Sequence, residues 1–299
     1  MRPPIDHSTV LLTGASAGIG RELARLLAPR VDTLVLVARR RDRLEALRAE
    51  LQSANPRLSV YLAPYDLADP AAVEALLTDV AQAVDPIDIL INNAGVGDQA
   101  LYDQADWARI QRMIAINAVA VARLTHGLVP AMVARHRGGI LTISSGAGIA
   151  LVPGAAAYTG TKHFVTGLME TLYAELADTG VVVTQVCPGP VDTEFDAAAG
   201  ITGMAGGPPQ AVRISAEQCA REALRGFERG QPLVFPGLAY RAMMRLLDCR
   251  GSIRTLLLVR ARRLGKLLVG GAEYPAEGGC GLRIQVAISA EMRLDDLRG

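Results

Sequence analysis

The sequence predicts an α/β fold in which a doubly wound parallel sheet is flanked by helices and followed by a helical C-terminal extension. Short apolar runs alternate with amphipathic segments of helical period up to about residue 236, and this alternation is typical of a parallel sheet. A glycine-rich turn joins the first run to the first helix, and polar residues follow the ends of several later runs. We therefore expect one domain over residues 1–236 and an extension over residues 237–299.

The composition excludes several classes of protein. The net charge is only +1, so the chain carries no overall basic footprint for nucleic acid. The four cysteines form no Cys-x-x-Cys pair and the four histidines show no ligand spacing, which predicts reduced thiols in a cytoplasmic protein and no metal site. The residues before Thr9 carry charges and lack the apolar segment of a signal peptide.

The first predicted unit is a strand over residues 9–13, a glycine turn and a helix over residues 22–28. The turn reads Gly14-Ala15-Ser16-Ala17-Gly18-Ile19-Gly20. Glycines let the backbone approach a pyrophosphate closely, and the N-terminus of the following helix offers free N–H groups and the positive end of its dipole. This order predicts a Rossmann-type dinucleotide-binding unit, with a plain glycine-rich turn as the alternative.

The second predicted strand, residues 33–38, is followed by a run of arginines: Arg39, Arg40, Arg41 and Arg43. Units that bind NAD usually carry an acidic residue here to hold the ribose hydroxyls, whereas an arginine accommodates the 2′-phosphate of NADP. Ala38 and Arg39 occupy this region, and Ser16 adds a hydroxyl from the glycine turn. The sequence therefore favours NADP(H) over NAD(H), which stays possible. We interpret Arg41 and Arg43 as solvated residues at a helix start.

The alternation continues along the chain. Further helices are expected over residues 41–53, 70–83, 107–135 and 156–177, and further strands over 59–64, 87–91, 139–143, 181–186 and 233–235. Ligands bind at the carboxyl ends of the strands in such a sheet. Asp66 and Leu67 follow the third strand, and Asn93, Ala94 and Gly95 follow the fourth. Asp66 alone is as often a helix cap as a ligand contact.

Two features in the middle of the chain have more than one interpretation. Asn117 lies among apolar residues of a predicted helix, and a buried amide needs hydrogen-bond partners. A satisfied core amide and a catalytic residue are equally compatible with this position. Residues 138–161 carry no charge, as a membrane span does, but Pro153 and the many glycines favour a buried strand, a tight loop and a helix start.

Tyr158 and Lys162 are four residues apart, a spacing that places both side chains on one face of a helix. An ammonium favours the phenolate, so we expect Lys162 to lower the pKa of Tyr158 from its usual value of about 10 toward the range of general acid–base catalysis. Ser145 can return over a strand-to-helix loop to hydrogen-bond the same phenol oxygen. A lone Tyr-x-x-x-Lys also arises by chance.

Six motifs, however, occur together and in order. They are Thr13-Gly14-x-x-x-Gly18-x-Gly20, Asn92-Asn93-Ala94-Gly95, Asn117, Ser145, Tyr158-x-x-x-Lys162 and Pro188-Gly189-x-Val191-x-Thr193. In this order and spacing the chain resembles the short-chain dehydrogenase/reductase family over about residues 8–236. The run of Arg39 and Arg40 is similar to that of NADP-preferring carbonyl and ketone reductases within the family.

The resemblance implies a catalytic tetrad. Tyr158 would be the acid–base group, and Lys162 would lower its pKa and hold the nicotinamide ribose. Ser145 would orient the substrate carbonyl, and Asn117 would keep a water in a proton relay. The implied cofactor-binding residues, besides Tyr158 and Lys162, are Gly14, Ser16, Gly18, Ile19, Gly20, Arg39, Arg40, Asp66, Leu67, Asn93, Ala94, Gly95, Pro188, Gly189, Val191 and Thr193.

Residues 194–214 are rich in alanine, glycine and proline and follow the Pro-Gly motif, where members of the family carry a loop over the substrate. We expect a lid here, and a disordered loop is the alternative. Ser215 and Gln218 have the spacing of a capping box that starts the next helix. Apolar residues of the lid and of the region around the site predict an apolar or mixed substrate: Phe195, Ile201, Met204, Val96, Leu151 and Val152.

Residues 240–268 are basic and amphipathic. They carry eight basic residues from Arg241 to Lys266 against one acidic residue, Asp248, interleaved with apolar residues. Such a segment can lie on an anionic membrane surface. It can equally be a helical flap over the substrate pocket, or a subunit contact with a solvated basic face.

The motifs predict hydride transfer between NADPH and an aldehyde or ketone, or the corresponding alcohol in reverse, by a cytoplasmic homodimer or homotetramer. An NAD-dependent alcohol dehydrogenase is the nearest alternative. A dinucleotide-sensing protein without turnover is another, although it has no use for both Tyr158 and Lys162. A third is an enzyme at the membrane surface that acts on a lipid-like carbonyl.

Overall fold

The computed structural model describes residues 2–200 and 212–247, and its centre is a parallel sheet of seven strands. The strands are β1 Thr9–Thr13, β2 Thr33–Val37, β3 Ser59–Ala63, β4 Ile89–Asn92, β5 Gly138–Ile143, β6 Val181–Val186 and β9 Leu233–Val234. Their order is β3-β2-β1-β4-β5-β6-β9, so the chain winds outward in both directions from β1 and β4. The expected doubly wound parallel sheet is confirmed.

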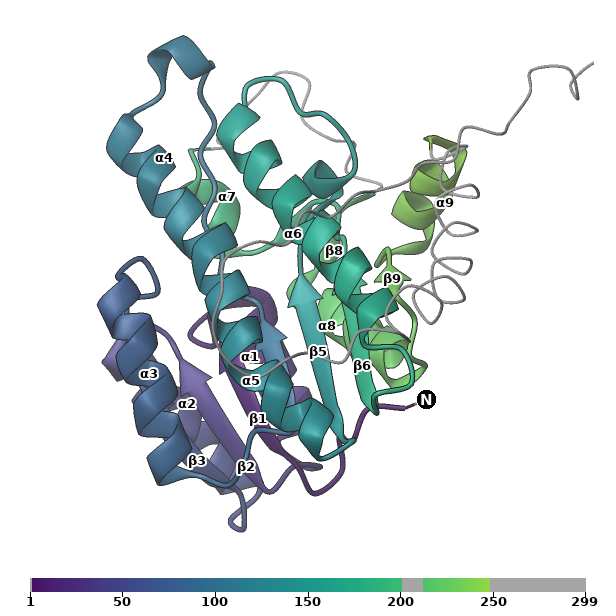
Figure 1. The fold of residues 1–299 in the computed structure, drawn as a ribbon. Helices are drawn as coiled ribbons and strands as arrows, with labels where there is room; N and C mark the ends of the chain where they lie inside the picture. The colour runs from purple at the N-terminus through teal and green to yellow at the C-terminus, as the bar shows by residue number, and fades with distance from the viewer. Residues whose placement is uncertain (1, 201–211, 248–299) are drawn as a thin grey trace, which may run out of the picture.

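Helices cover both faces of this sheet (Figure 1). One face carries α1 Gly18–Leu27, α2 Arg41–Ala54 and α8 Ala216–Glu228, and the other carries α3 Pro70–Ala83, α4 Trp107–Ile114, α5 Val121–Ala134 and α6 Ala156–Glu175. Each face buries its own apolar cluster, with Leu23 and Phe227 in the first and Leu76 and Met169 in the second. A sheet buried on both faces explains why its strands are continuous apolar runs and do not alternate.

Short elements lie at the carboxyl ends of the strands. They are the 3₁₀ turns η1 Tyr102–Gln104 and η3 Gly146–Gly148, the paired strands β7 Val191–Asp192 and β8 Ile214–Ser215, and the helices α7 Glu194–Ala198 and α9 Leu238–Leu247. The pairing of β7 with β8 was not expected from the sequence. In Figure 1, α4, α6 and α7 surround this end of the sheet.

Side chains tie together the loops that follow β1 and β4, the two strands between which the winding changes direction. The Thr13 hydroxyl donates to the Ile91 carbonyl at 3.2 Å and accepts the N–H groups of Asn93 and Ala94, each at 3.0 Å. The Asn93 amide donates to the carbonyls of Thr13 at 2.9 Å and Gly14 at 3.2 Å. A crevice at this point of a doubly wound sheet is where ligands bind.

The long helical stretch expected over residues 107–135 is confirmed as one continuous segment, Trp107–Ala134, with one irregular stretch. Helix α4 continues into α5 through one π-helical stretch, η2 Ala115–Ala120, which contains Asn117. The Asn117 amide pairs with the backbone of Val96 twice, accepting its N–H at 2.9 Å and donating to its carbonyl at 2.8 Å. Single π-helical turns of this kind occur frequently at functional sites. Here the turn carries the Asn117 side chain that bonds to Val96.

The segment Trp107–Ala134 is the one helical segment among the described residues with the length and hydropathy to cross a membrane. The core helix of a soluble protein passes the same test. In the most apolar window of this segment, 44% of the residues are buried, and Val121, Leu124 and Met132 belong to a core cluster beside the sheet. We therefore interpret the segment as a core helix.

Other boundaries shift by a few residues. Helix α1 begins at Gly18 and not at residue 22, so two of the three turn glycines lie in its first turn. The predicted capping box is half formed: Ser215 accepts the Gln218 N–H at 3.1 Å, but the Gln218 amide donates to Glu222 at 2.9 Å and does not return to residue 215. Helix α9 covers the start of the basic amphipathic segment, and residues 248–268 lie outside the described residues.

Candidate active site

The glycine turn forms a backbone cradle at the N-terminus of α1. Gly14 and Gly18 have φ of 68° and 53°, the left-handed region that glycine adopts without strain. A Cβ on Gly14 would lie 2.8 Å from the Ala94 Cα, and one on Gly20 would lie 2.3 Å from the Gly14 carbonyl oxygen. No side chain caps α1, so its first N–H groups are available to an anion. This cradle fits the pyrophosphate of a dinucleotide.

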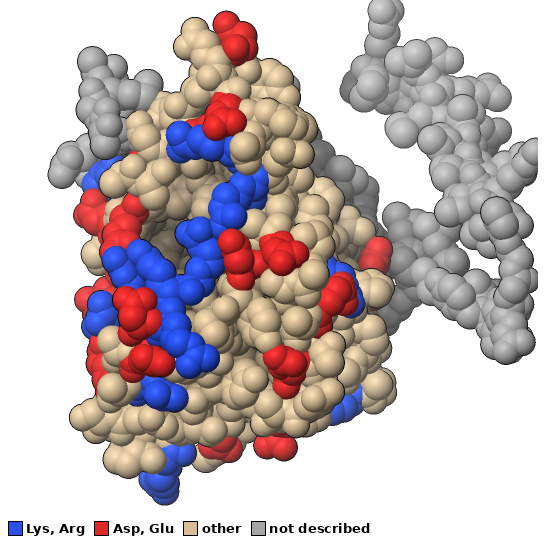
Figure 2. Space-filling view, turned by 90° about the vertical axis from the view of Figure 1, so that its left-hand side faces the viewer, with Lys and Arg blue, Asp and Glu red and all other residues tan. Residues whose placement is uncertain are grey.

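Beside the cradle, arginines gather where β2 ends and α2 begins. Arg39 is exposed, and its charge contributes to lowering the pKa of the Asp66 carboxyl. Arg40 Nη2 lies 3.4 Å from Ser16 Oγ. The interpretation of Arg43 as merely solvated is wrong, because its guanidinium pairs with Glu194 at 2.8 Å. Figure 2 shows one face of the molecule, in which Lys and Arg side chains lie beside a hollow.

Asp66, at the end of the β3 segment, has a partner that the sequence did not reveal. Arg112 Nη2 on α4 donates to both carboxylate oxygens, at 2.9 and 2.8 Å, and the Ala68 N–H donates at 3.0 Å. Burial alone raises the pKa of Asp66, but Arg112 and this N–H hold it below its ordinary value. Leu67 beside it is buried. Arg112 thus fixes the orientation of this carboxylate, one of the predicted cofactor-binding groups.

The four predicted catalytic residues come together at the ends of β4, β5 and α6. Gly95 lies between two of them: a Cβ added there would be 3.5 Å from Asn117 Oδ1 and 3.6 Å from Lys162 Nζ. Asn117 donates to Thr161 Oγ1 at 3.2 Å, and this hydroxyl donates to the Tyr158 carbonyl at 2.8 Å. The π-helical turn is therefore linked directly to the helix of Tyr158 and Lys162.

Around the phenol, Lys162 Nζ lies 5.7 Å from the centre of the Tyr158 ring and donates to the Ile143 carbonyl at 3.3 Å. Ser145 hydrogen-bonds the phenol and also accepts the Ala147 N–H at 3.1 Å. The direction expected for the pKa of Tyr158 is reversed. Burial raises it to about 12, and the hydrogen bond with Ser145 only partly offsets this.

The same burial acts on Lys162, which is only 5% exposed. It lowers the pKa of the Lys162 ammonium to about 8, because a low-dielectric site disfavours the charged form. At pH 7 the phenol is therefore protonated and the amine remains mostly charged. An acid–base pair in these two states can donate a proton to an oxygen held beside Tyr158.

The segment after β6 closes the other side of the cleft. The Pro188 carbonyl accepts the Gly146 N–H at 2.9 Å, and Val191 is buried in the β7–β8 pair. Thr193 caps α7 through the Phe195 N–H at 3.2 Å. Its methyl would lie 3.0 Å from a Cβ on Gly18. The last predicted motif therefore faces the glycine turn across the cleft.

Sequence reasoning missed Tyr240, which reaches the site from α9. It is 5% exposed, and its ring packs so closely on Gly189 that a Cβ there would lie 2.7 Å from the ring. A Cβ on Gly146 would lie 1.9 Å from the Tyr240 hydroxyl. Burial raises the pKa of Tyr240. In the sequence Tyr240 was only the first residue of the amphipathic segment, for which a flap over the substrate pocket was one of the interpretations.

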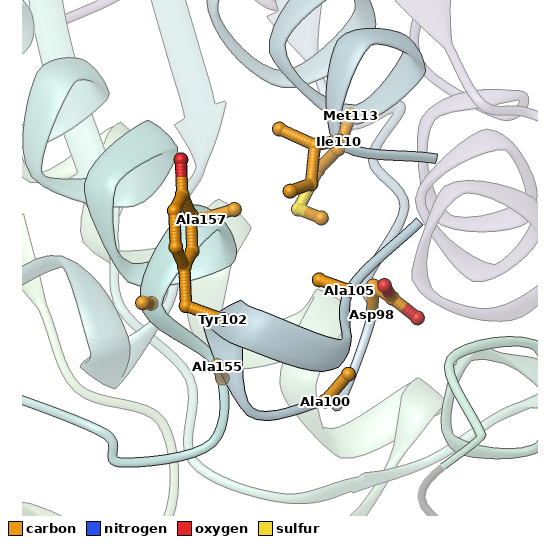
Figure 3. Close-up of a pocket in the computed structure, with 9 residues that line it drawn as sticks. Asp98, Ala100, Tyr102, Ala105, Ile110, Met113, Ala155 and Ala157 are labelled. Atoms are coloured by element: carbon orange, nitrogen blue, oxygen red, sulfur yellow. The ribbon is translucent and has the colours of Figure 1, made fainter. Parts of the chain in front are cut away.

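One of the predicted apolar side chains, Phe195, lies beside the phenol. The Phe195 ring centre is 5.9 Å from that of Tyr158, and Leu151 and Val152 are exposed nearby in sequence. Ile201 and Met204 lie outside the described residues. A pocket next to α6 adds residues that were not predicted (Figure 3), with Tyr102 beside Ala157 and with Ile110 and Met113 across the gap.

Comparison with known proteins decides the family. The sequence profile described as short chain dehydrogenase matches residues 8–202. The chain belongs to the short-chain dehydrogenase family. Human dehydrogenase/reductase SDR family member 7 is 35% identical over 194 residues, which are 64% of this chain and 57% of that protein. The chain thus spans less than two thirds of that relative.

Two solved structures are similar over most of both chains. A short-chain dehydrogenase from Sphingobium yanoikuyae in complex with NADPH has a TM-score of 0.73 and 34% identity, covering 84% of this chain and 95% of its own. A bulky-bulky ketone specific alcohol dehydrogenase from Comamonas testosteroni has a TM-score of 0.71 and 28% identity, covering 83% and 94%. These likenesses agree with the fold and with the family.

The contact between Tyr240 and Gly146 gives a stability prediction. Gly146→Ala should lower the free energy of unfolding by about 1–3 kcal/mol, as overpacking does, because its methyl meets the Tyr240 hydroxyl. Adding Tyr240→Phe should recover most of this loss, since without that oxygen the nearest ring atom is 3.2 Å away. Denaturant unfolding of the single and double variants measures the coupling.

The matched control is Gly167→Ala on α6, where a Cβ meets nothing within 4 Å and helix propensity favours alanine by roughly 0.5–1 kcal/mol. Equal effects of Gly146→Ala with and without Tyr240→Phe would contradict the packing described above.

The depressed pKa of Lys162 gives a pH prediction. Between pH 8 and its ordinary 10.5, the unfolded chain binds more protons than the folded one, so the stability of the folded protein rises with pH there. Below pH 8 the cost of the buried ammonium is fully present. Lys162→Met should therefore be more stable than the wild type at pH 7, and this advantage should shrink as pH rises from 8 to 10.

Thermal unfolding of both proteins from pH 6.5 to pH 10 measures this difference. Other groups that titrate in this range are common to both proteins and cancel in the difference. An advantage that does not vary with pH would show that Lys162 does not titrate as described.

Proposed function

We propose that this protein is an NADP(H)-dependent oxidoreductase that reduces an aldehyde or ketone, or oxidises the corresponding alcohol. The observation that carries the proposal is the assembly of Ser145, Tyr158 and Lys162 at one end of a dinucleotide cradle. Membership in the short-chain dehydrogenase family supports it. The chain spans only 57% of the human relative, so substrate and direction are part of the proposal.

The cofactor, when bound, supplies the hydride that reaches the carbonyl carbon. The protein holds and moves the proton. Ser145 Oγ hydrogen-bonds the substrate oxygen and orients it beside Tyr158 Oη. The Tyr158 O–H bond breaks as its proton passes to that oxygen, which gives the alcohol and a phenolate. Lys162 stabilises the phenolate through its charge, and the phenol is restored by a proton from solvent.

Asn117 and Thr161 lie next to Tyr158 and Lys162 and help to hold them in position. Asn117 bonds to Val96 and Thr161, and its Oδ1 faces the glycine at position 95 beside Lys162. This arrangement supports a role for the amide in holding a water next to the Lys162 ammonium. We propose that such a water relays the proton that restores Tyr158.

Three observations support NADP(H) over NAD(H). The position after β2 holds Ala38 and Arg39 and no carboxylate, Arg39 is exposed and interacts with the Asp66 carboxylate only through its charge, and Ser16 contacts Arg40. The similar Sphingobium enzyme was solved with NADPH. The Phe195 ring beside Tyr158 and the likeness to a bulky-bulky ketone specific enzyme support an apolar or mixed carbonyl substrate of some bulk.

Localisation, assembly and the division of the chain at residue 236 remain predictions: a cytoplasmic homodimer or homotetramer, with membrane contact through residues 240–268 as the alternative. The structure changes how that alternative is tested. Tyr240 and Met244 are buried, so the truncation has to begin after Leu247 to leave the site intact, and it removes the part of the basic segment from Asp248 onward. Vesicle binding can then be compared between the full chain and the truncated one.

Tyr158→Phe tests the proposed reaction. Loss of a general acid should lower kcat for carbonyl reduction by roughly 10²–10⁴-fold, while NADPH should bind within about twofold of the wild type, because the ring and Lys162 remain. Turnover with a panel of apolar ketones and aldehydes, together with a fluorescence titration of NADPH, measures both. Tyr102→Phe, an exposed tyrosine at the neighbouring pocket, is the control. Near-normal turnover of Tyr158→Phe would overturn the mechanism.

Arg39→Ala tests the cofactor. Charge-assisted contacts to a phosphate contribute about 1.5–3 kcal/mol, so NADPH should bind roughly 10- to 100-fold more weakly and NADH should be unaffected. Arg48→Ala, an exposed arginine further along α2, is the matched control. Preference of the wild type for NADH would favour the alcohol dehydrogenase alternative. Binding of a dinucleotide without turnover of any carbonyl or alcohol would favour a sensing protein.

A further inference from the structure

Glu194, the first residue of α7, reaches across the cleft to the start of α2. Arg43 Nη1 donates to both of its carboxylate oxygens, at 2.8 and 2.9 Å. Arg40 Nη1 and Nη2 each lie 3.5 Å from Oε2. These two arginines lower the pKa of Glu194, Arg43 foremost, so the carboxylate is ionised at neutral pH.

The same Arg40 guanidinium belongs to the proposed 2′-phosphate site. Its Nη2 lies 3.4 Å from Ser16 Oγ in the glycine turn, and Arg39 is its neighbour in sequence. A guanidinium binds carboxylates and phosphates through the same planar fork of N–H groups. The carboxylate of Glu194 and the 2′-phosphate of the cofactor therefore have the same binding partner.

We propose that Glu194 is a specificity-determining residue whose carboxylate competes with the 2′-phosphate of NADP(H) for Arg40. This inference rests on the NADP(H) site proposed above. The competition is one-sided. Arg40 contacts Glu194 only at 3.5 Å and shares its donors with Ser16, and exposed ion pairs of this kind contribute little. The dianionic phosphate displaces the carboxylate from Arg40, and Glu194 keeps its closer partner, Arg43.

Competition lowers the affinity for NADP(H) and leaves NAD(H) untouched, because NAD(H) has no phosphate at this position. Glu194 therefore reduces the discrimination between the two cofactors. It also adds a negative charge near the bound phosphate, and this repulsion is screened by salt. Competition and repulsion both weaken the binding of NADP(H).

Helix α7 does not depend on Glu194 for its place. Thr193 caps it, Arg213 binds Asp196 at 2.9 Å on the same helix, and Phe195 lies near the Tyr158 ring. Glu194 itself is 62% exposed. A change of its charge should therefore leave the fold and the apolar side of the site intact, which makes it a clean test.

The experiment is a fluorescence titration of Glu194→Gln and the wild type with NADPH and, separately, with NADH. NADPH should bind about 3- to 10-fold more tightly to the variant, and NADH should bind within about twofold of the wild type. The gain should shrink as the salt concentration is raised from 20 mM to about 500 mM. Asp192→Asn is the control, because it removes an exposed charge that pairs with Arg213 and not with the arginines of α2.

Weaker NADPH binding to Glu194→Gln would mean that the carboxylate orients Arg40 for the phosphate. Unchanged binding would mean that the Glu194 carboxylate does not affect NADPH binding. Either result overturns the competition. Failure of the NADP(H) site itself is distinguishable: the wild type would then show no preference for NADPH, and Arg39→Ala would change neither titration. If the wild type prefers NADPH and the Arg39→Ala variant does not, the proposed NADP(H) site is supported, whatever the result for Glu194→Gln.

Discussion

The short network of Thr13 and Asn93 is the constraint on which the rest of the site depends. A doubly wound sheet has one place where neighbouring strands send their chains to opposite sides, and here it lies between β1 and β4. Five hydrogen bonds among Thr13, Asn93 and their neighbours fix the two loops at that place. The glycine turn and residues 93–95 are therefore held in one register, and Gly95 in turn meets Asn117 and Lys162.

Burial and charge oppose one another in the acid–base pair. From the spacing of Tyr158 and Lys162 alone, the ammonium should dominate and lower the pKa of the phenol. Burial is the larger effect for both groups, so the pKa of the phenol rises and that of the amine falls. The cost of keeping an ammonium in this site is the kind of local destabilisation that functional sites retain because the chemistry needs it.

The two sides of the cleft are joined by residues from late in the chain. Helix α7 brings Glu194 to the arginines of α2 and Phe195 to the phenol, while Tyr240 from α9 packs under the loops that carry Ser145 and Pro188. The cofactor side and the substrate side of the cleft thus share a border made by two short helices.

The sequence by itself determined the alternation of strands and helices, the glycine turn and the spacing of Tyr158 and Lys162, because each of these depends on residues close together along the chain. It could not determine the π-helical turn at Asn117, the pair of Asp66 with Arg112, the contact of Glu194 with Arg43, or the buried packing position of Tyr240. Their partners are 21, 46 and 151 residues away in the first three cases. Only the folded sheet, which gathers the ends of its strands at one edge, decides which of those residues meet.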